Sequence, residues 1–173
     1  MTNLAGQSTT TLSNNIEAEY IAYARRRLLM EYLPKIQKCI AELSDEDVWW
    51  RSDETNNSIG NLILHLSGNV RQWIVGGLGG VSDVRNRAQE FSERTHIAKS
   101  ALLKKLEDTL RDADRVLEQF DSRRLLEPTT LQGFEATYLD ALSHVVEHFA
   151  LHLGQIIFIT KLRAKKDLKF YNL

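Results

Sequence analysis

The sequence predicts an all-helical protein, a bundle of four helices around one shared core. Proline occurs only at positions 34 and 128, which leaves long stretches free to form long helices. Apolar residues recur at helical spacing in four segments, and no segment alternates for long enough to build a sheet. A chain of 173 residues, 43% of them hydrophobic, has the size of a single domain. We assign residues 1–14 to a flexible N-terminal segment and residues 15–173 to the bundle.

The first helix is predicted from about Asn15 to Leu43, with a kink or break at Pro34. A polar loop, 44–57, follows and contains a short turn around Trp49 and Trp50. The apolar residues that define this first helix lie at helical spacing: Ile16, Tyr20, Ala24, Leu28 and Tyr32.

The second helix is predicted from Ile59 to about Val75, with Ser58 or Asn57 as its N-cap. Glycines at 76, 77, 79 and 80 are expected to end it. Its apolar stripe consists of Ile59, Leu62, Ile63, Leu66, Val70, Trp73 and Ile74.

The third and fourth helices are predicted from about Thr95 to Phe120 and from about Ala136 to Lys165. Basic residues at the end of the fourth helix suit the negative pole of its dipole. The connections 76–94 and 121–135 are long for neighbouring antiparallel helices. We therefore expect at least one of them to cross over the bundle or to form part of a site.

The overall charge excludes several classes of partner. The net charge is -1, so nothing indicates a nucleic-acid partner or an anionic membrane surface. No apolar run approaches the roughly 20 residues that span a bilayer. The single cysteine, Cys39, cannot form an internal disulfide, and the polar N-terminus lacks the pattern of a signal peptide. We expect a cytoplasmic protein with no membrane partner.

Histidines on the fourth predicted helix form the clearest chemical pattern. His144, His148 and His152 follow one another at four-residue spacing, which places neighbours on one face of a helix. At about 100° per residue, His148 and His152 lie at the edge of the apolar arc and His144 lies on the polar side. Two imidazoles at this spacing can bind one metal ion, although hydrogen-bonded core histidines fit the same pattern. His144 is interpreted as a surface residue or as a residue that supports the ligands.

Two other histidines lie elsewhere in the chain. His65, in the second helix, is the candidate third ligand, but it lies roughly 60° outside the apolar stripe, so periodicity does not fix where it points. His96 is interpreted as exposed. Glu93 and His96 form the only Glu-x-x-His pair, whereas a ferritin-like di-iron site needs two such pairs, so that class fits poorly.

Three segments, 57–69, 144–148 and 152–155, resemble the DinB (YfiT-like) superfamily. The motif Arg85-x-Arg87-x-x-Glu90-Phe91 is similar to that of an uncharacterised branch. The resemblance implies a four-helix bundle of up-down-down-up topology, often a homodimer. It also implies a three-histidine metal site with one ligand from the second helix and two from the last. The residues that match are His65, His148 and His152, while Leu151 stands where relatives often have a further histidine.

The resemblance also implies a chemistry. Three imidazoles leave at least one coordination position open, as in catalytic sites. We expect one divalent ion per chain, zinc, nickel or iron. Characterised relatives include thiol-dependent enzymes in which the metal activates a low-molecular-weight thiol. The working hypothesis is therefore a metal-dependent S-transferase or hydrolase that acts on a small molecule. The alternative is a non-catalytic, stress-associated dimer that binds metal or a partner.

Five further residues are candidates for the site. Glu147, Gln155 and Asn69 are candidate catalytic or supporting residues, and solvated or helix-stabilising roles fit them equally. Arg85 and Arg87 are candidates for binding a substrate carboxylate, and a solvated surface loop is the alternative.

Overall fold

The computed structural model describes residues 6–131 and 133–170, with side chains from residue 16 onward. Most of the described chain is helical, and two helices contain π-helical segments, here labelled η1 and η2. The elements in chain order are α1 (Gly6–Arg26), η1 (Arg27–Tyr32), α2 (Leu33–Ala41), α3 (Asp45–Trp49), α4 (Ile59–Val70), η2 (Arg71–Leu78), α5 (Arg87–Ser92), α6 (Lys99–Gln119), the 3-10 turn η3 (Ser122–Arg124), β1 (Pro128–Leu131), β2 (Phe134–Thr137) and α7 (Tyr138–Ala164).

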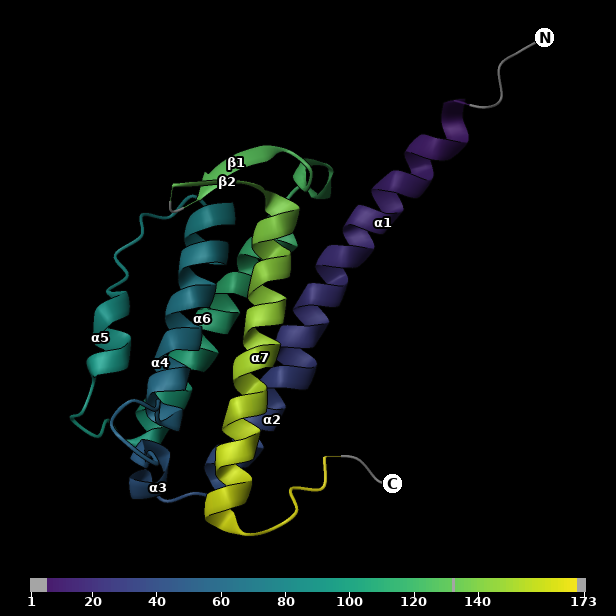
Figure 1. Ribbon diagram of the computed structural model, residues 1–173. Helices are drawn as coiled ribbons and strands as arrows, with labels where there is room; N and C mark the ends of the chain where they lie inside the picture. Colours follow the sequence, from purple (N-terminus) through teal and green to yellow (C-terminus); the bar gives the residue numbers. More distant parts are fainter. Residues whose placement is uncertain (1–5, 132, 171–173) are drawn as a thin grey trace.

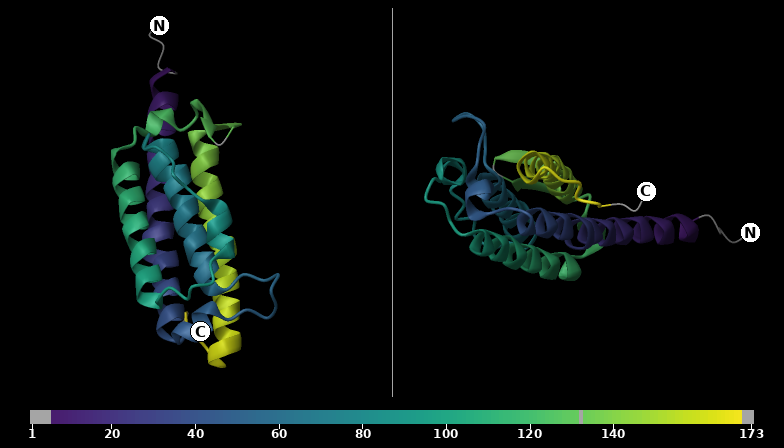
Figure 2. Two further views of the ribbon diagram at one scale, coloured as in Figure 1. Left: turned by 90° about the vertical axis from the view of Figure 1, so that its left-hand side faces the viewer. Right: turned by 90° about the horizontal axis from the view of Figure 1, so that it is seen from below.

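Four long helical stretches form the bundle, as the sequence predicts. They are α1 continued through η1 and α2, then α4 continued through η2, then α6, and finally α7 (Figures 1 and 2). The connection 79–98 returns along the length of the bundle and carries α5, so α4 and α6 run in the same direction (Figure 1). The first and last stretches run the opposite way. The predicted up-down-down-up topology and the predicted crossover are thereby confirmed.

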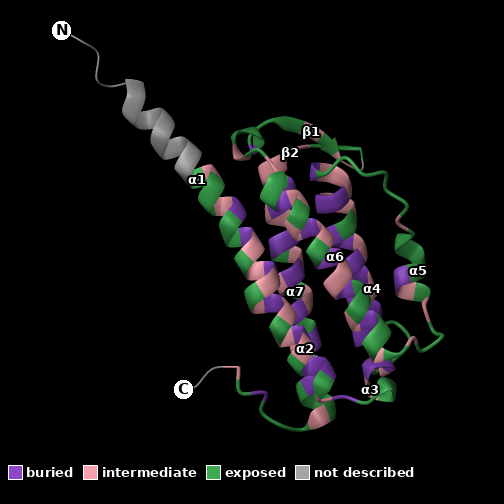
Figure 3. Ribbon diagram, turned by 180° about the vertical axis from the view of Figure 1, so that it is seen from behind, coloured by how far each residue is buried: buried purple, intermediate pink, exposed green. Residues whose placement is uncertain are grey.

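The core lies along the bundle axis, and each helix contributes one buried stripe (Figure 3). The six aliphatic residues predicted for the stripe of α4 and η2 are all buried, and Trp73 packs against their cluster half-buried. The buried residues of α7 lie at the same helical spacing. They are Ala141, Leu142, Val145, Val146, Phe149, Leu153, Ile156 and Thr160.

Polar side chains set where three of the helices begin. The hydroxyl of Ser58 accepts a hydrogen bond from the backbone N–H of Asn61, and the side chain of Asn61 returns the contact. Thr137 and Asp140 make the same reciprocal cap at the start of α7. Ser44 and Asp47 do so for α3. Such caps satisfy backbone donors that have no partner inside a helix. The predicted N-cap Ser58 is therefore confirmed.

The first helix begins earlier than predicted. It starts at Gly6 rather than near Asn15, because the stretch between them contains no proline and simply continues a helix that Ile21 and Ala24 anchor in the core. Residues 1–5 of the predicted flexible segment lie outside the described residues. The break expected at Pro34 is absent, since the helix continues through it as α2, and the irregularity is the π-helical segment η1, which ends at Tyr32.

The end predicted for the second helix was wrong. Its glycines do not stop it at Val75, since η2 continues to Leu78. A Cβ atom on Gly77 would lie 2.9 Å from the side chain of Leu131, so this glycine makes room for a neighbouring segment. The third helix starts at Lys99 instead of Thr95, because His96 has a left-handed backbone with φ of 56°.

Helix α5 and the β1–β2 hairpin lie inside segments that were predicted as loops. Helix α5 interrupts the predicted loop 76–94, and the side chain of Asn86 caps it. Strands β1 and β2 form an antiparallel hairpin, with Leu131 opposite Phe134, inside the predicted loop 121–135. Both elements are too short to show a period in the sequence.

Helix α7 is also the one helix, among the described residues, that is long and apolar enough to cross a membrane by length and composition. In the fold it is one of the four long helical stretches of the bundle, and its buried face meets the other helices. The ends of α7 match the prediction, with Lys161 and Arg163 in its last turn and a left-handed Lys165 after it.

Candidate metal centre

Helices α4 and α7 bring three histidine side chains together. The Nε2 atom of His148 lies 3.0 Å from that of His65 and 3.1 Å from that of His152. One nitrogen from each of the three residues lies within 4.8 Å of the other two. His65 is buried, and the two histidines of α7 are half-buried. The structure therefore places His65, which periodicity alone left undecided, against the pair on the last helix.

The Nδ1 atoms of His65 and His152 each lie beside an oxygen acceptor. Nδ1 of His65 lies 3.0 Å from a carboxylate oxygen of Glu90, and Nδ1 of His152 lies 2.7 Å from the side-chain oxygen of Gln155. Both oxygens accept hydrogen bonds, so a proton on each Nδ1 would complete these two contacts and leave the two Nε2 atoms with lone pairs. At His65 the Nη2 donor of Arg85, 3.0 Å from the same Nδ1, competes with this arrangement. Three Nε2 atoms this close repel unless a cation or a proton lies among them.

The spacing fits a cation. Two imidazole nitrogens, each bonded to a tetrahedral zinc ion at roughly 2.0–2.1 Å, are separated by about 3.4 Å. The observed separations of 3.0 and 3.1 Å are close to that value. A carboxylate that accepts from the second nitrogen of a ligand histidine is a common feature of such sites. The donor set on α4 and α7 therefore suits one divalent ion.

Glu90 is held by Arg85 as well as by His65. The guanidinium of Arg85 donates from Nε to one carboxylate oxygen of Glu90 and from Nη2 to the other, both at 2.7 Å. Its Nη1 donates to the side chain of Gln72, also at 2.7 Å. Burial raises the pKa of Glu90. The hydrogen bonds with Arg85 and His65 together lower it by more than burial raises it, so the net shift is downward. Glu90 is therefore an anion at neutral pH and can orient His65.

Helix α4 has a glycine where this pair approaches it. A Cβ atom on Gly68 would lie 1.9 Å from Oε1 of Glu90 and 2.8 Å from Nε of Arg85. Any larger residue there would push the carboxylate away from His65. Gly68 is thus part of the same arrangement, one turn along α4 from the histidine.

His148 and His152, the two candidate ligands on α7, have lowered pKa values that favour their neutral form. Burial, and then the neighbouring histidines, lower the pKa of His148 to about 3. Burial also lowers the pKa of His152 and of His144. Nδ1 of His148 is buried and, among the described residues, has no hydrogen-bond partner. Neutral imidazole is the form that binds a metal ion.

This shift predicts that the metal-free protein loses stability in acid. The pKa of His148 is about 3 in the folded chain and 6.5 by default, so the unfolded chain binds the extra proton first. The stabilisation is present above about pH 6.5 and falls as the pH is lowered toward about pH 3. We expect the melting temperature of metal-free protein to fall between about pH 7.5 and pH 5, and to fall less in His148→Gln. Thermal unfolding followed by circular dichroism tests this, and an equal fall in both proteins would contradict it.

His144 lies beside the three histidines rather than among them. Its Nε2 lies 3.2 Å from the side-chain nitrogen of Asn69, and its ring packs 4.6 Å from that of Trp73. The side-chain oxygen of Asn69 is buried and has no partner among the described residues. Glu147 is exposed on α7. Among the candidate supporting residues, Gln155 has a polar contact with His152 and Asn69 has one with His144. No such contact with a histidine is present for Glu147 among the described residues.

The two candidate arginines have different surroundings. Arg85 is committed to Glu90 and Gln72, as described above, and its Nη2 also lies 3.0 Å from Nδ1 of His65. Arg87 is exposed, and its guanidinium lies over the ring of Phe91, which packs on His65 at 4.6 Å. His96 is exposed, as predicted, and its ring stacks on that of Trp49.

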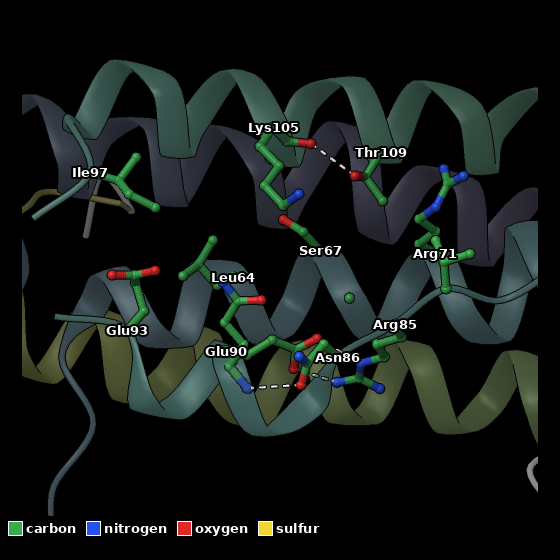
Figure 4. A pocket seen from close by; sticks show the side chains of 13 residues that line it. Leu64, Ser67, Arg71, Arg85, Asn86, Glu90, Glu93, Ile97, Lys105 and Thr109 are labelled. Atoms are coloured by element: carbon green, nitrogen blue, oxygen red, sulfur yellow. Dashed lines mark hydrogen bonds and ion pairs between the residues drawn. The ribbon is translucent and has the colours of Figure 1, made fainter. Parts of the chain in front are cut away.

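A pocket of about 400 Å³ lies between α4, α5 and α6. Figure 4 shows Lys105 and Thr109 of α6 on one side and Arg85 and Glu90 on the other. Glu90 therefore separates this pocket from His65. The sequence predicts Glu90 only as part of a motif. The glycine Gly68, inside a helix, is the local signal that a neighbouring segment approaches closely there.

Comparison with known proteins agrees with this fold. The sequence matches the family described as "Protein of unknown function (DUF1572)" over residues 15–173. The structure is similar to the crystal structure of a DinB-like protein from Bacillus cereus ATCC 10987, with a TM-score of 0.65 and 14% sequence identity, over 83% of this chain and 92% of that chain. No curated protein matches the sequence. At this identity the likeness shows the fold, which is the DinB-like bundle that the sequence predicts. Since the family match covers nearly the whole chain, the protein belongs to the DUF1572 family and has a DinB-like fold.

Proposed function

We propose that this protein holds one divalent metal ion with His65, His148 and His152 and uses it as a metal-dependent enzyme, a thiol-dependent S-transferase or a hydrolase. The observation that carries the proposal is the convergence of three Nε2 atoms from two helices. Contacts with Glu90 and Gln155 support the proposal, since they would orient the rings of His65 and His152.

An ion bound by three neutral imidazoles would lower the pKa of a water or thiol that reaches its open position. The surrounding side chains would then position the substrate. The buried oxygen of Asn69 has no partner among the described residues, so it can accept a hydrogen bond from a ligand. Exposed Glu147, one residue before His148, remains a candidate for moving a proton, and exposed Arg87 a candidate for binding a substrate anion.

The chain itself does not supply a reactive thiol. Cys39 is fully buried, and burial raises the pKa of its thiol, so the nucleophilic thiolate is disfavoured. A thiol-dependent reaction would therefore use a small thiol from solution. We expect low-molecular-weight thiols to be the co-substrates.

Turnover with added thiols tests the enzymatic proposal. The metal-loaded protein is assayed with alkyl or aryl electrophiles across a panel of low-molecular-weight thiols, and with ester or amide substrates without thiol. We expect a rate that disappears in His148→Ala and persists in Cys39→Ser. If neither reaction gives a rate above that of free metal, the enzymatic proposal is wrong even where the metal site is real.

The alternative is a metal-binding or interaction dimer without catalysis. Exposed apolar side chains on α7 support a contact with a second copy, since Leu151 is 63% and Phe158 is 64% exposed. We propose a homodimer in the cytoplasm. Sedimentation equilibrium of the wild type and of Leu151→Glu would measure the dimerisation.

A further inference from the structure

A second pocket, of about 410 Å³, opens in the groove between α4 and α7. Its third wall is the loop 50–57, which lies beside the C-terminal half of α7 (Figure 2, left). Leu62 lines it three residues before His65, and Gln155 lines it three residues after His152. One helical turn rises about 5.4 Å, so the pocket begins next to the histidine cluster. Gln155 lines the pocket and also contacts the histidine cluster, since its side-chain oxygen lies beside Nδ1 of His152.

Arg51 is the cation of this pocket, and its guanidinium is poorly satisfied. Its Nη1 atom is buried without a hydrogen-bond partner among the described residues. Its Nη2 reaches Oδ1 of Asn61 only at 3.4 Å, and that oxygen already accepts a hydrogen bond from the hydroxyl of Ser58 at 2.7 Å. Leaving a buried charged donor without a partner is costly. The guanidinium therefore keeps a donor that the described chain does not satisfy.

No acidic side chain of the described residues neutralises Arg51 through an ion pair. Glu54 acts on it only at longer range, and the neighbouring charge of Arg94 has the same sign. The contrast with Arg85 is clear, since Arg85 forms a bidentate pair with Glu90. The second pocket therefore has a positive charge in its wall that no ion pair of the described residues balances.

The remaining wall has an apolar part beside a polar part, the latter formed by Ser52, Thr55, Asn56, Asn57 and Gln155. The apolar part has two sides. Trp50 and Leu62 form one part of it, and Phe158 and Leu162 of α7 form another. Phe158 is 64% and Leu162 is 50% exposed, so both present carbon surface that no part of the described chain covers. A ligand that fits has an anionic end for Arg51 and an apolar body for these side chains.

We propose that this pocket binds an organic carboxylate with an apolar or aromatic body, and that Arg51 grips the carboxylate through two parallel N–H donors. A guanidinium matches the two oxygens of a carboxylate in this way. The ligand then lies one helical turn from His65 and His152. Only this last step, presentation of the ligand to a metal centre, rests on the proposed function. The binding of the carboxylate does not.

The test uses metal-free, full-length protein, so that direct binding of the probe to a metal is excluded. Phenylacetate is titrated by calorimetry, alongside uncharged phenylacetamide and phenylphosphonate. We expect phenylacetate to bind and phenylacetamide to bind at least about tenfold more weakly. Stronger binding of the phosphonate than of the carboxylate would overturn the assigned ligand class.

Two variants of equal charge change separate this pocket from the first one. In Arg51→Gln, we expect the affinity for phenylacetate to fall about ten- to a hundredfold. In Arg71→Gln, which changes an exposed arginine of the pocket between α4 and α6, the affinity should stay the same. Equal loss in both variants, or no loss in Arg51→Gln, would overturn the proposal.

Stability gives an independent measurement. Because Arg51 makes one long hydrogen bond and leaves a buried donor unpaired, Arg51→Gln should melt at the same temperature as the wild type or higher. Phenylacetate should raise the melting temperature of the wild type and leave that of the variant unchanged. A variant that melts several degrees lower would show that Arg51 is structural, against the proposal. Carboxylate binding by a chain that never takes up metal would uphold the pocket and remove only the proposed function.

Discussion

Protein purified without a histidine tag is expected to carry about one divalent metal ion per chain, and the His65→Ala/His148→Ala variant none. The three Nε2 atoms converge from α4 and α7, and removing one ligand from each helix leaves a single imidazole. Elemental analysis by mass spectrometry measures the metal directly. The wild type should also melt at a lower temperature after chelation, because an ion that binds only the folded chain stabilises it by about 2.7 kcal/mol at a hundred times its Kd.

Two control variants sharpen this experiment. His96→Ala removes an exposed histidine whose ring stacks on Trp49 and makes no ring contact with the three candidate ligands. His144→Ala removes the neighbour of His148 on the same helix, whose Nε2 contacts Asn69 instead. Both should retain the metal, whereas His152→Ala should not. Loss of metal in His144→Ala with retention in His152→Ala would show that the other pair on α7 provides the ligands.

The second large effect is expected at Gly68. In Gly68→Ala, the new methyl group takes the place of the Glu90 carboxylate, so His65 loses its acceptor and Arg85 its bidentate partner. We expect the free energy of unfolding to fall by about 1–3 kcal/mol, since buried charged donors lose their partners. Metal affinity should fall about 10- to 100-fold, as for other residues that support a ligand histidine. Urea unfolding and competition with a chelating dye measure the two effects.

Gly154→Ala is the matched control, because a Cβ atom there meets nothing within 4 Å. An alanine within an exposed helical position should raise the stability by about 0.5–1 kcal/mol, so the same substitution has the opposite sign at the two sites. Glu90→Gln keeps the shape of the side chain and removes its charge. If this variant binds metal as tightly as the wild type, the charge of Glu90 does not support His65, and the Gly68 effect is purely steric.

Local patterns in the sequence predicted much of this protein. The spacing of apolar residues predicted four helices, and the four-residue spacing of His148 and His152 predicted a pair on one face of the last helix. The N-cap at Ser58 was predicted from residue type alone. These features depend on residues within one or two turns of each other, and helix geometry fixes their relation.

Short or interrupted elements were harder to predict. The β1–β2 hairpin and α5 span too few residues for a period. The glycines after Val75 suggested a helix end, but η2 continues to Leu78, and at Gly77 the side chain of Leu131 packs where a Cβ atom would lie. A sequence pattern describes what a segment favours by itself. The contact between Gly77 and Leu131 joins segments that are far apart in the chain.

What the sequence determined by itself is the set of helices and the histidine pair on the last of them, because one helix fixes both through its own backbone. Only the tertiary structure decided that His65 faces this pair, that Glu90 and Arg85 reach His65 over Gly68, and that a guanidinium nitrogen of Arg51 has no partner in the described part of the chain. Each of these depends on how side chains from separate helices pack. The crossing of the chain between α4 and α6 sets that packing, and no local period encodes it.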